Sequence, residues 1–260
     1  MDTGKIADNP TDRNPLAKTW EVGVVSTCER SRTLLPRTIA SLESGGFKVN
    51  RIFMDGDADV PFFIPMSTRS PKVGVHPNTH LCLLEMFYRN RFADLYLVAQ
   101  DDILAVRNLR QYLDTQPYPE QGYWNLSTHM SNVHLGRLAS TRWFPGHQNG
   151  YGALGIVMDN RAARQLLTTP GLIDWATDPK APRRFPKYID GAIATTFAAL
   201  GYTQYCHMPS LLCHTGYQST IRRQRVWDAT LTDTFPGEDF DAMSWTDHED
   251  SLRGQAQQGR

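Results

Sequence analysis

Residues 95–102, LYLVAQDD, combine an apolar run of strand length with two adjacent carboxylates. The first five residues include aromatic and β-branched side chains, which is typical of a buried strand in an α/β sheet. Ligand sites in open α/β sheets lie just beyond the carboxyl ends of such strands, where Asp101 and Asp102 fall. Their hard oxygen ligands suit Mg²⁺ or Mn²⁺, which can bridge to a diphosphate. The same residues also fit a plain turn and cap before an expected helix at 108–113.

Length and composition bound the class of protein. The chain has 260 residues, of which 40% are hydrophobic and 21% charged, so it can form one large α/β domain or two small ones with a sizeable core. Lys and Arg together number 27, as do Asp and Glu, and the formal net charge is zero. That balance argues against a general polyanion-binding protein, although it leaves room for a local basic patch.

Targeting and redox signals point to the cytoplasm. No apolar stretch is long enough to span a bilayer, and residues 1–6 are polar rather than an apolar signal-peptide core. The cysteines show no CxxC spacing, and without an export signal we interpret them as reduced thiols of a cytoplasmic protein. They are Cys28, Cys82, Cys206 and Cys213.

The chain divides into three expected segments. Residues 1–19 are polar and contain Asn-Pro twice, which is typical of a mobile arm, and residues 20–235 form the α/β domain. Residues 236–260 are acidic and then rich in Gln and Gly, so we expect a weakly ordered tail. The polar stretch 129–149 is expected to be a long loop, with three histidines whose spacing matches no standard metal site. Apolar and periodic patterns predict strands at 20–27, 49–54, 95–99, 123–127, 150–158 and 202–208, and helices at 34–42, 78–92, 108–113, 160–167 and 191–200.

The first strand, helix and second strand have the order that opens a nucleotide-binding α/β half. The polar loop 27–32 and the turn at Asp55 should therefore fall at the same edge of the sheet. A carboxylate after the second strand suits a ribose hydroxyl or a base N–H. A plain turn is the alternative interpretation of Asp55.

Over roughly residues 22–219, the order of these features resembles the GT-A glycosyltransferases, which use nucleotide-sugar donors and are built on one mixed α/β domain. Residues 24–30, VVSTCER, look like the first strand and nucleotide loop of that family. Asp55 matches the acidic residue that usually contacts the base or ribose. The resemblance thus implies a donor site that includes Thr27, Glu29, Arg30, Asp55 and Asp101.

The resemblance also implies a metal site. Gln100-Asp101-Asp102 resembles the DxD-type motif, with Gln where Asp or Glu is usual, which places the metal on Asp102 and leaves Asp101 in support. Residues 209–216, PSLLCHTG, are similar to a C-terminal segment in which a histidine completes the metal site, so His214 is the second expected ligand. An imidazole ligand favours Mn²⁺ over Mg²⁺. A buried structural histidine is the alternative for His214.

The resemblance places the catalytic base near the acceptor. Residues 150–158 are similar to the acceptor-side glycine strand, and residues 188–191, YIDG, to the segment that carries the base. An inverting transfer would then use Asp190 to take the proton of the acceptor hydroxyl. We expect the positive end of the following helix to favour the ionised carboxylate. Asp190 could instead be only a helix cap, and without a base there the enzyme would be retaining.

The resemblance therefore implies a Mn²⁺- or Mg²⁺-dependent glycosyltransferase of the hexosyltransferase type, with a nucleotide-sugar donor, a UDP-sugar on family grounds. The acceptor stays open between a glycan, a small molecule and a nucleic acid. A non-catalytic nucleotide-sugar-binding module is one alternative. A nucleotidyltransferase that makes nucleotide sugars is another, although such enzymes usually have a glycine-rich loop where residues 27–32, TCERSR, contain no glycine. Arginines at 183–184 and 222–225, with Trp227, could form a basic patch.

Overall fold

The computed structural model describes residues 18–61, 63–148, 154–170, 172, 189–215 and 234–245. Strands in this part of the chain are β1 (Trp20–Thr27), β2 (Arg51–Asp55), β3 (Met66–Arg69), β4 (Leu95–Gln100), β5 (Ile103–Ala105), β6 (Gly122–Asn125), β7 (Trp143–Pro145), β8 (Gly155–Asp159), β9 (Thr203–His207) and β10 (Leu212–His214). Helices are α1 (Leu34–Ser44), α2 (Val75–Arg89), α3 (Leu109–Thr115), α4 (Met130–Leu138), α5 (Asn160–Leu167) and α7 (Ile189–Ala199), with a 3-10 turn at Cys28–Arg30.

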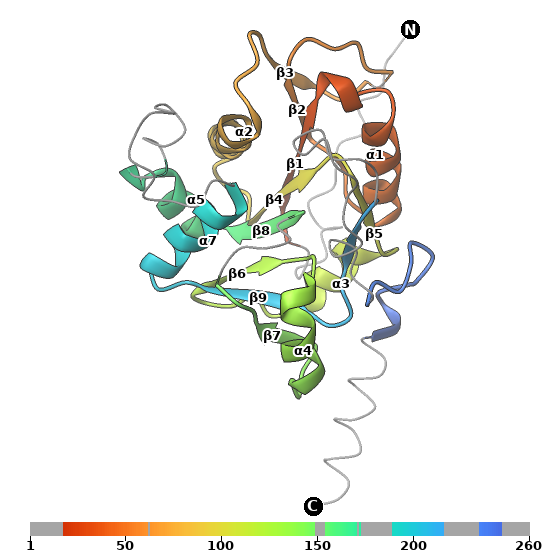
Figure 1. Cartoon of the computed structure of the whole chain (residues 1–260), viewed down its shortest axis with the longest axis vertical. Helices are drawn as coiled ribbons and strands as arrows, with labels where there is room; N and C mark the ends of the chain where they lie inside the picture. Colours follow the sequence, from red (N-terminus) through yellow and green to blue (C-terminus); the bar gives the residue numbers. More distant parts are fainter. Residues whose placement is uncertain are drawn as a thin grey trace, which may run out of the picture.

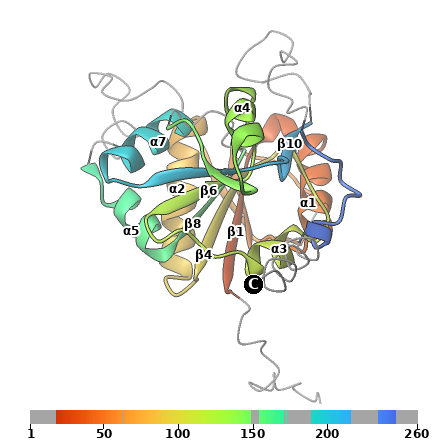
Figure 2. The same ribbon diagram turned by 90° about the horizontal axis from the view of Figure 1, so that it is seen from below.

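One mixed sheet organises the described residues. Eight strands follow the order β3-β2-β1-β4-β8-β6-β9-β7, and β5 pairs with β10 in a separate two-stranded sheet (Figure 1). Strands β1 to β4 run parallel, whereas β8 runs antiparallel to both β4 and β6. Seen from below, α2, α5 and α7 cover one face of the sheet, and α1 and α3 cover the other (Figure 2). The expected fold class, an α/β domain with a mixed sheet flanked by helices, is confirmed.

Parallel pairing brings the ends of three strands to one edge. Thr27 lies opposite Asp55 where β1 pairs with β2, and Val25 lies opposite Gln100 where β1 pairs with β4. Asp101 follows directly at the same edge. The expectation that the loop after β1 and the turn after β2 meet at one edge is therefore confirmed, and the carboxylate pair lies there too.

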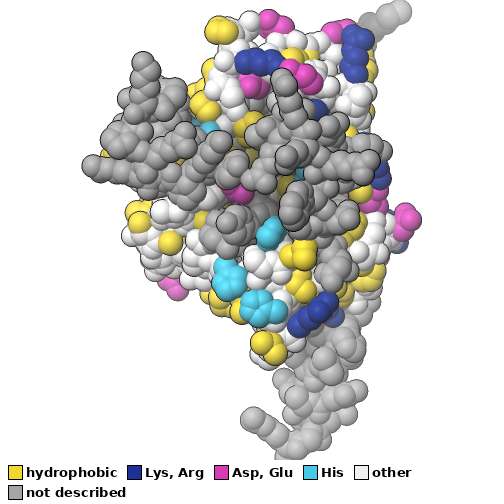
Figure 3. Space-filling view, viewed as in Figure 1, with side chains coloured by type: hydrophobic (Ala, Val, Ile, Leu, Met, Phe, Trp, Pro, Cys, Tyr) yellow, Lys and Arg dark blue, Asp and Glu magenta, His cyan; other side chains and the backbone are white. Residues whose placement is uncertain are grey.

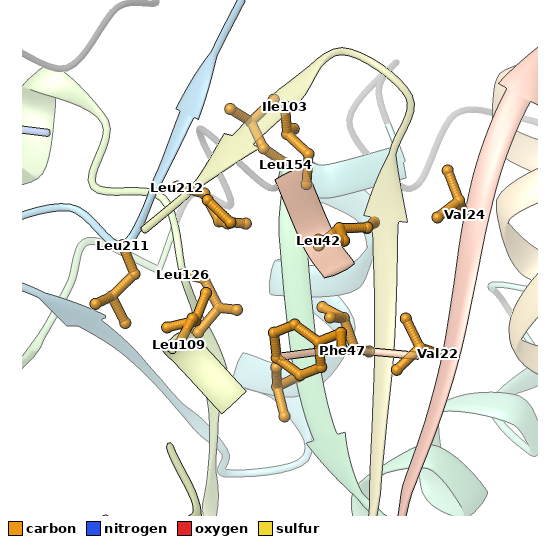
Figure 4. Packing of buried hydrophobic residues seen from close by; sticks show 14 of the residues in the cluster. Val22, Val24, Leu42, Phe47, Ile103, Leu109, Leu126, Leu154, Leu211 and Leu212 are labelled. Atoms are coloured by element: carbon orange, nitrogen blue, oxygen red, sulfur yellow. The ribbon is translucent and has the colours of Figure 1, made fainter. Parts of the chain in front are cut away.

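The central strands are buried on both faces because each face packs against helices. On β4, Leu97 belongs to the apolar cluster on the α1 side, while Val98 belongs to the cluster on the α2 side. Figure 4 shows part of the first cluster, with Val22 of β1 and Leu42 of α1 turned toward Phe47 and other apolar residues. Full burial of one such side chain contributes about 1.5–3 kcal/mol, so these clusters account for most of the driving force that holds the site's strands together.

Gly23 allows α2 to approach the sheet closely. A Cβ at this position would lie 2.4 Å from Met86 Sδ and 2.9 Å from both Cys82 Sγ and Phe53 Cε2. A Cβ there would force these side chains to shift, so the absence of a side chain on β1 lets the side chains of α2 pack directly against the strand. This contact matters for the site, because the first turn of α2 lines it.

One sequence prediction about a loop is wrong. The stretch 129–149 contains helix α4 and strand β7 rather than a continuous loop. His129 caps α4, since its Nδ1 accepts a hydrogen bond from the backbone N–H of Ser131. The polar composition of α4 hid its helical pattern, and three- or four-residue edge strands are too short to show a period.

Residues 236–245, which belong to the tail expected from the sequence, pack against the domain in the structure. Ala242 and Trp245 are buried, and the Trp245 ring packs 5.3 Å from the ring of Tyr112 on α3. The backbone N–H of Arg107 donates to Phe240 O, and the N–H of Ala242 donates back to Arg107 O, both at 3.0 Å. Residues 246–260 and 1–17 lie outside the described residues. Within the described residues, no helix combines the length and apolar character needed to cross a bilayer.

Candidate functional site

The Asp101–Asp102 turn connects the central sheet to the small β5–β10 sheet. Antiparallel pairing sets His214 of β10 opposite Ile103 of β5, the residue after Asp102. The backbone N–H of Thr215 also donates to the carbonyl oxygen of Asp102 at 2.9 Å. This pairing brings the Nε2 atom of His214 to 3.0 Å from Asp102 Oδ2. The structure thus brings together the two residues that the sequence predicts as metal ligands.

Arg30 lies between the two carboxylates. One nitrogen, Nη1, is 2.8 Å from Asp101 Oδ1 and 2.5 Å from Asp102 Oδ2. Ser26 on β1 donates its hydroxyl to Asp101 Oδ2 at 2.6 Å. Arg30 reaches this position because the chain leaves β1 through the 3-10 turn at Cys28–Arg30. The side chains of Arg30, Asp101 and Asp102 are only 12%, 5% and 3% exposed, so the ion pairs are shielded from water.

The two carboxylates are electrostatically different. Burial and the neighbouring charge of Asp102 raise the pKa of Asp101 above its ordinary value. Burial acts in the same direction on Asp102, but the hydrogen bond and charge of His214 and the charge of Arg30 outweigh it and lower the pKa of Asp102. Asp102 is therefore the carboxylate held in the ionised form, which is the form that binds a metal ion.

These groups line a cavity that also reaches the first turn of α2. Its lining residues come from the ends of β1, β2 and β4, from α2 and from β10: Val25, Ser26, Thr27, Arg30, Asp55, Val75, Asn78, Thr79, Gln100, Asp101, Asp102 and His214. Among the residues that the structure describes, four buried polar atoms of this wall have no hydrogen-bond partner: Thr27 Oγ1, Arg30 Nε, Asn78 Oδ1 and Asp102 Oδ1. Native proteins leave few such atoms, because each costs about 1–3 kcal/mol. Their concentration in one cavity indicates a ligand site.

Two predicted donor-site residues have structural partners. Both carboxylate oxygens of Asp55 accept backbone N–H groups, from Val73 at 2.7 Å and from Gly74 at 3.0 Å. Asp55 lines the cavity, but its carboxylate holds the chain that leads into α2. Glu29 is half exposed, forms an ion pair with Lys72, and is absent from the described lining of the cavity. The hydrogen bond from Lys72 lowers the pKa of Glu29, which is the signature of a surface ion pair.

Asp190 lies in an adjoining, mostly apolar hollow. The two hollows share Val25, Thr79 and Gln100 as walls. Asp190 is in the first turn of α7, where its Oδ1 accepts the backbone N–H of Gly191 at 2.9 Å. Burial raises its pKa, so the apolar surroundings outweigh the helix end that was expected to favour the ionised form. The structure therefore places Asp190 next to the carboxylate pair's cavity rather than in its wall.

The residues present fit a divalent ion with few protein ligands. Asp102 Oδ1 is buried and unpartnered among the described residues, and the imidazole of His214 lies beside the same carboxylate. Mg²⁺ and Mn²⁺ in phosphate sites commonly take one or two protein ligands and fill the other positions with water and phosphate oxygens. In the described part of the chain, no group of three or more His, Cys, Asp or Glu side chains is arranged to hold a metal.

Histidines also gather away from this site. Figure 3 shows histidine side chains on the face near α4, and the rings of His134 and His147 lie 5.7 Å apart, centroid to centroid. Both are exposed. They do not belong to the described wall of the cavity beside the carboxylate pair.

No family model matches the sequence, and no curated protein matches it. Solved structures with a similar chain path include a Bacillus anthracis protein assigned as a glucose-1-phosphate thymidylyltransferase, solved with sucrose (10% identity, covering 78% of this chain and 93% of that chain, TM-score 0.47). A second is Drosophila β-1,4-galactosyltransferase 7 with manganese, UDP-Gal and xylobiose (9%, 84% and 82%, TM-score 0.41). A third is a glycosyltransferase involved in glycosylation of the major capsid of PBCV-1 (11%, 76% and 94%, TM-score 0.42). At these identities the likeness concerns the path of the chain and does not extend to activity.

Sequence reasoning missed several residues of the cavity wall, and two of them bear on its chemistry. Ser26 holds Asp101 in place, and Asn78 presents an unpartnered acceptor. Ser26 ends the apolar part of β1, so its position at the sheet edge was a usable signal. No comparable signal in the sequence pointed to Asn78, since a single Asn in a helix is ordinary. Three predicted features fall at least partly outside the described residues: the basic segments 183–184 and 222–225, and residues 150–153 of the glycine-rich stretch 150–158.

Proposed function

We propose that this chain is a metal-dependent glycosyltransferase of the hexosyltransferase type that transfers a sugar from a nucleotide-sugar donor to a hydroxyl acceptor. The observation that carries the proposal is Asp102, which is buried at a strand end beside His214 and has an unpartnered oxygen among the described residues. A UDP-sugar is the donor implied by the resemblance, and a glycan, a small molecule or a nucleic acid remains the acceptor class. A cytoplasmic location is part of the same proposal.

Each side chain has a role in this proposal. Asp102 and His214 would hold Mn²⁺, or Mg²⁺, and the ion would supply positive charge for the leaving diphosphate. Ser26 and Arg30 both donate hydrogen bonds to Asp101, which in turn helps to hold Arg30 beside Asp102. Arg30 keeps its unpartnered Nε for a ligand oxygen, since a guanidinium donates well to phosphate. Thr27 lies in the wall of the same cavity and would face the nucleotide.

Asp190 is proposed as the base that accepts the proton of the acceptor hydroxyl, which makes the transfer inverting. Its adjoining hollow shares three wall residues with the metal-side cavity, so an acceptor there would approach a donor bound beside Asp102. Burial raises the pKa of the Asp190 carboxyl, which makes its carboxylate a stronger base for the proton of an acceptor hydroxyl. The proposed base and the proposed metal ligands would therefore act at one reaction centre.

The test is nucleoside diphosphate binding and release with Mn²⁺. Calorimetry across UDP, CDP, GDP and ADP, followed by release assays with the matching sugar donors, should show binding that depends on the metal. Asp102→Asn keeps the size of the side chain and should lose metal-dependent binding and release while the protein stays folded. Asp59→Asn is the matched control, because Asp59 is 91% exposed and pairs only weakly with Arg32 at 3.5 Å.

Three outcomes would contradict the proposal. Full nucleotide binding and release in excess EDTA would show that the protein needs no metal ion. If no nucleoside diphosphate binds in the presence of Mn²⁺, a nucleotide-sugar donor is excluded. Release of pyrophosphate from a nucleoside triphosphate and a sugar phosphate, without sugar transfer, would instead establish the nucleotidyltransferase alternative.

A further inference from the structure

The side-chain amide of Asn78 is a buried polar group in the cavity wall that has not been given a role. Asn78 lies in the first turn of α2 and is only 1% exposed. It shares the cavity wall with Thr79 of the same helix and with Asp55 at the end of β2.

The orientation of this amide is set by the sheet. Asn78 Nδ2 donates to the carbonyl oxygen of Phe53 on β2 at 2.9 Å. A carbonyl oxygen can only accept, so the nitrogen must face β2 and the oxygen must face the other way. Asn78 Oδ1 is buried and has no partner among the described residues. A buried unpaired acceptor costs about 1–3 kcal/mol, so a hydrogen-bond donor from a ligand would recover that energy.

Asp55 holds the start of the helix that carries Asn78, and its carboxylate is not free to bind the same ligand group. Its carboxylate accepts the N–H groups of Val73 and Gly74, the two residues just before α2. Gly74 has a φ of +92°, a conformation that an L side chain rarely adopts, and α2 begins at the next residue. Asp55 therefore fixes where α2 starts, and with it the place of Asn78. The acidic residue that the sequence predicts as a base or ribose contact is a positioning residue.

Asn78 and the carboxylate pair lie at a separation that suits the two halves of one nucleotide. Asn78 is tied to β2, the carboxylates follow β4, and β1 lies between these strands. Two strand spacings correspond to about 10 Å. The ionic groups of Asp102, Arg30 and His214 suit the diphosphate and its metal, which leaves the neutral acceptor of Asn78 for the nucleoside.

We propose that Asn78 Oδ1, and not Asp55, accepts a hydrogen bond from an N–H of the base or a hydroxyl of the ribose, and so selects the nucleoside half of the donor. This inference rests on the proposed function, because it needs a nucleotide in the cavity. The base N–H and the ribose hydroxyl share one chemistry: each is a neutral hydrogen-bond donor that can reach the buried amide oxygen of Asn78.

The experiment compares Asn78→Leu with the wild type, using as probes the nucleoside diphosphate that binds best and inorganic pyrophosphate, both with Mn²⁺. Calorimetry should show about tenfold weaker binding of the nucleoside diphosphate to the variant, the value of one lost neutral hydrogen bond, and unchanged binding of pyrophosphate. Asn90→Leu is the matched control, because Asn90 caps the far end of α2 and its amide donates to Glu21 outside the cavity.

Nucleotide analogues identify the donor group and do not depend on the variant being stable. Wild-type protein is titrated with the 2′-deoxy, 3′-deoxy and base N-methyl forms of the same nucleotide. One analogue should bind about tenfold more weakly, and Asn78→Leu should show no further loss with that analogue. Equal affinity of wild type and Asn78→Leu for the nucleotide, an equal loss for pyrophosphate, or wild-type affinity for all three analogues would each overturn the inference and leave the proposed function intact. Absence of any nucleotide binding to the wild type would overturn both.

Discussion

Arg30→Met should strongly destabilise the protein, because it removes the only cation that contacts both buried carboxylates in the described part of the chain. Arg30 Nη1 lies 2.8 Å from Asp101 and 2.5 Å from Asp102, and the three side chains are 12%, 5% and 3% exposed. Removing one partner of a buried ion pair costs about 3–5 kcal/mol, because the remaining charge has neither water nor a counterion. That is a large part of the 5–15 kcal/mol by which ordinary domains are stable.

The measurement is the free energy of unfolding from urea denaturation at neutral pH. Arg32→Met is the control, since Arg32 and Asp59 are 74% and 91% exposed and 3.5 Å apart, and the free energy should change by at most about 0.5 kcal/mol. Adding Asp101→Asn to Arg30→Met removes one of the two repelling charges and should restore about 1–3 kcal/mol. A loss below about 1 kcal/mol for Arg30→Met, or purely additive effects in the double variant, would refute the coupling inferred from the geometry.

Two further predictions concern protonation. Asp190→Asn should keep donor binding near normal and reduce sugar transfer on the order of a hundredfold or more, whereas a residue that only caps α7 would leave transfer nearly unchanged. Because burial raises the pKa of Asp190, wild-type transfer should rise with pH through that raised pKa, and the variant should lack this rise in a pH–rate profile. Burial lowers the pKa of His207 to about 3, against about 6.5 in an unfolded chain. The unfolded state thus takes up a proton first as the pH falls, so stability is complete above pH 6.5 and should drop by ~2 kcal/mol between pH 7 and pH 5. Urea denaturation across this range should show a shallower decline for His207→Asn, and parallel declines would contradict the assignment.

The sheet was accessible from local sequence patterns. The run in β4 is apolar at consecutive positions because helices cover both faces of the sheet, and that requirement is visible in any short window. The first strand and helix α5 have the predicted bounds, Trp20–Thr27 and Asn160–Leu167. Helix α4 and the packed segment 236–245 were not accessible, because polar helices and chain ends are held by tertiary contacts that leave no period in the sequence.

By itself, the sequence determined that two carboxylates follow a buried central strand, and that a second acidic residue follows the neighbouring strand. The position of a strand can be predicted from the local composition, whereas the partners of its side chains cannot. Only the tertiary structure decided what these carboxylates contact. Arg30 reaches Asp102 across 72 positions of chain, and the register of β10 on β5 brings His214 to the same carboxylate. Asp55 is directed to the start of α2, which leaves Asn78 facing the cavity. These pairings depend on how distant segments align, and alignment follows from packing of the whole core rather than from any short stretch.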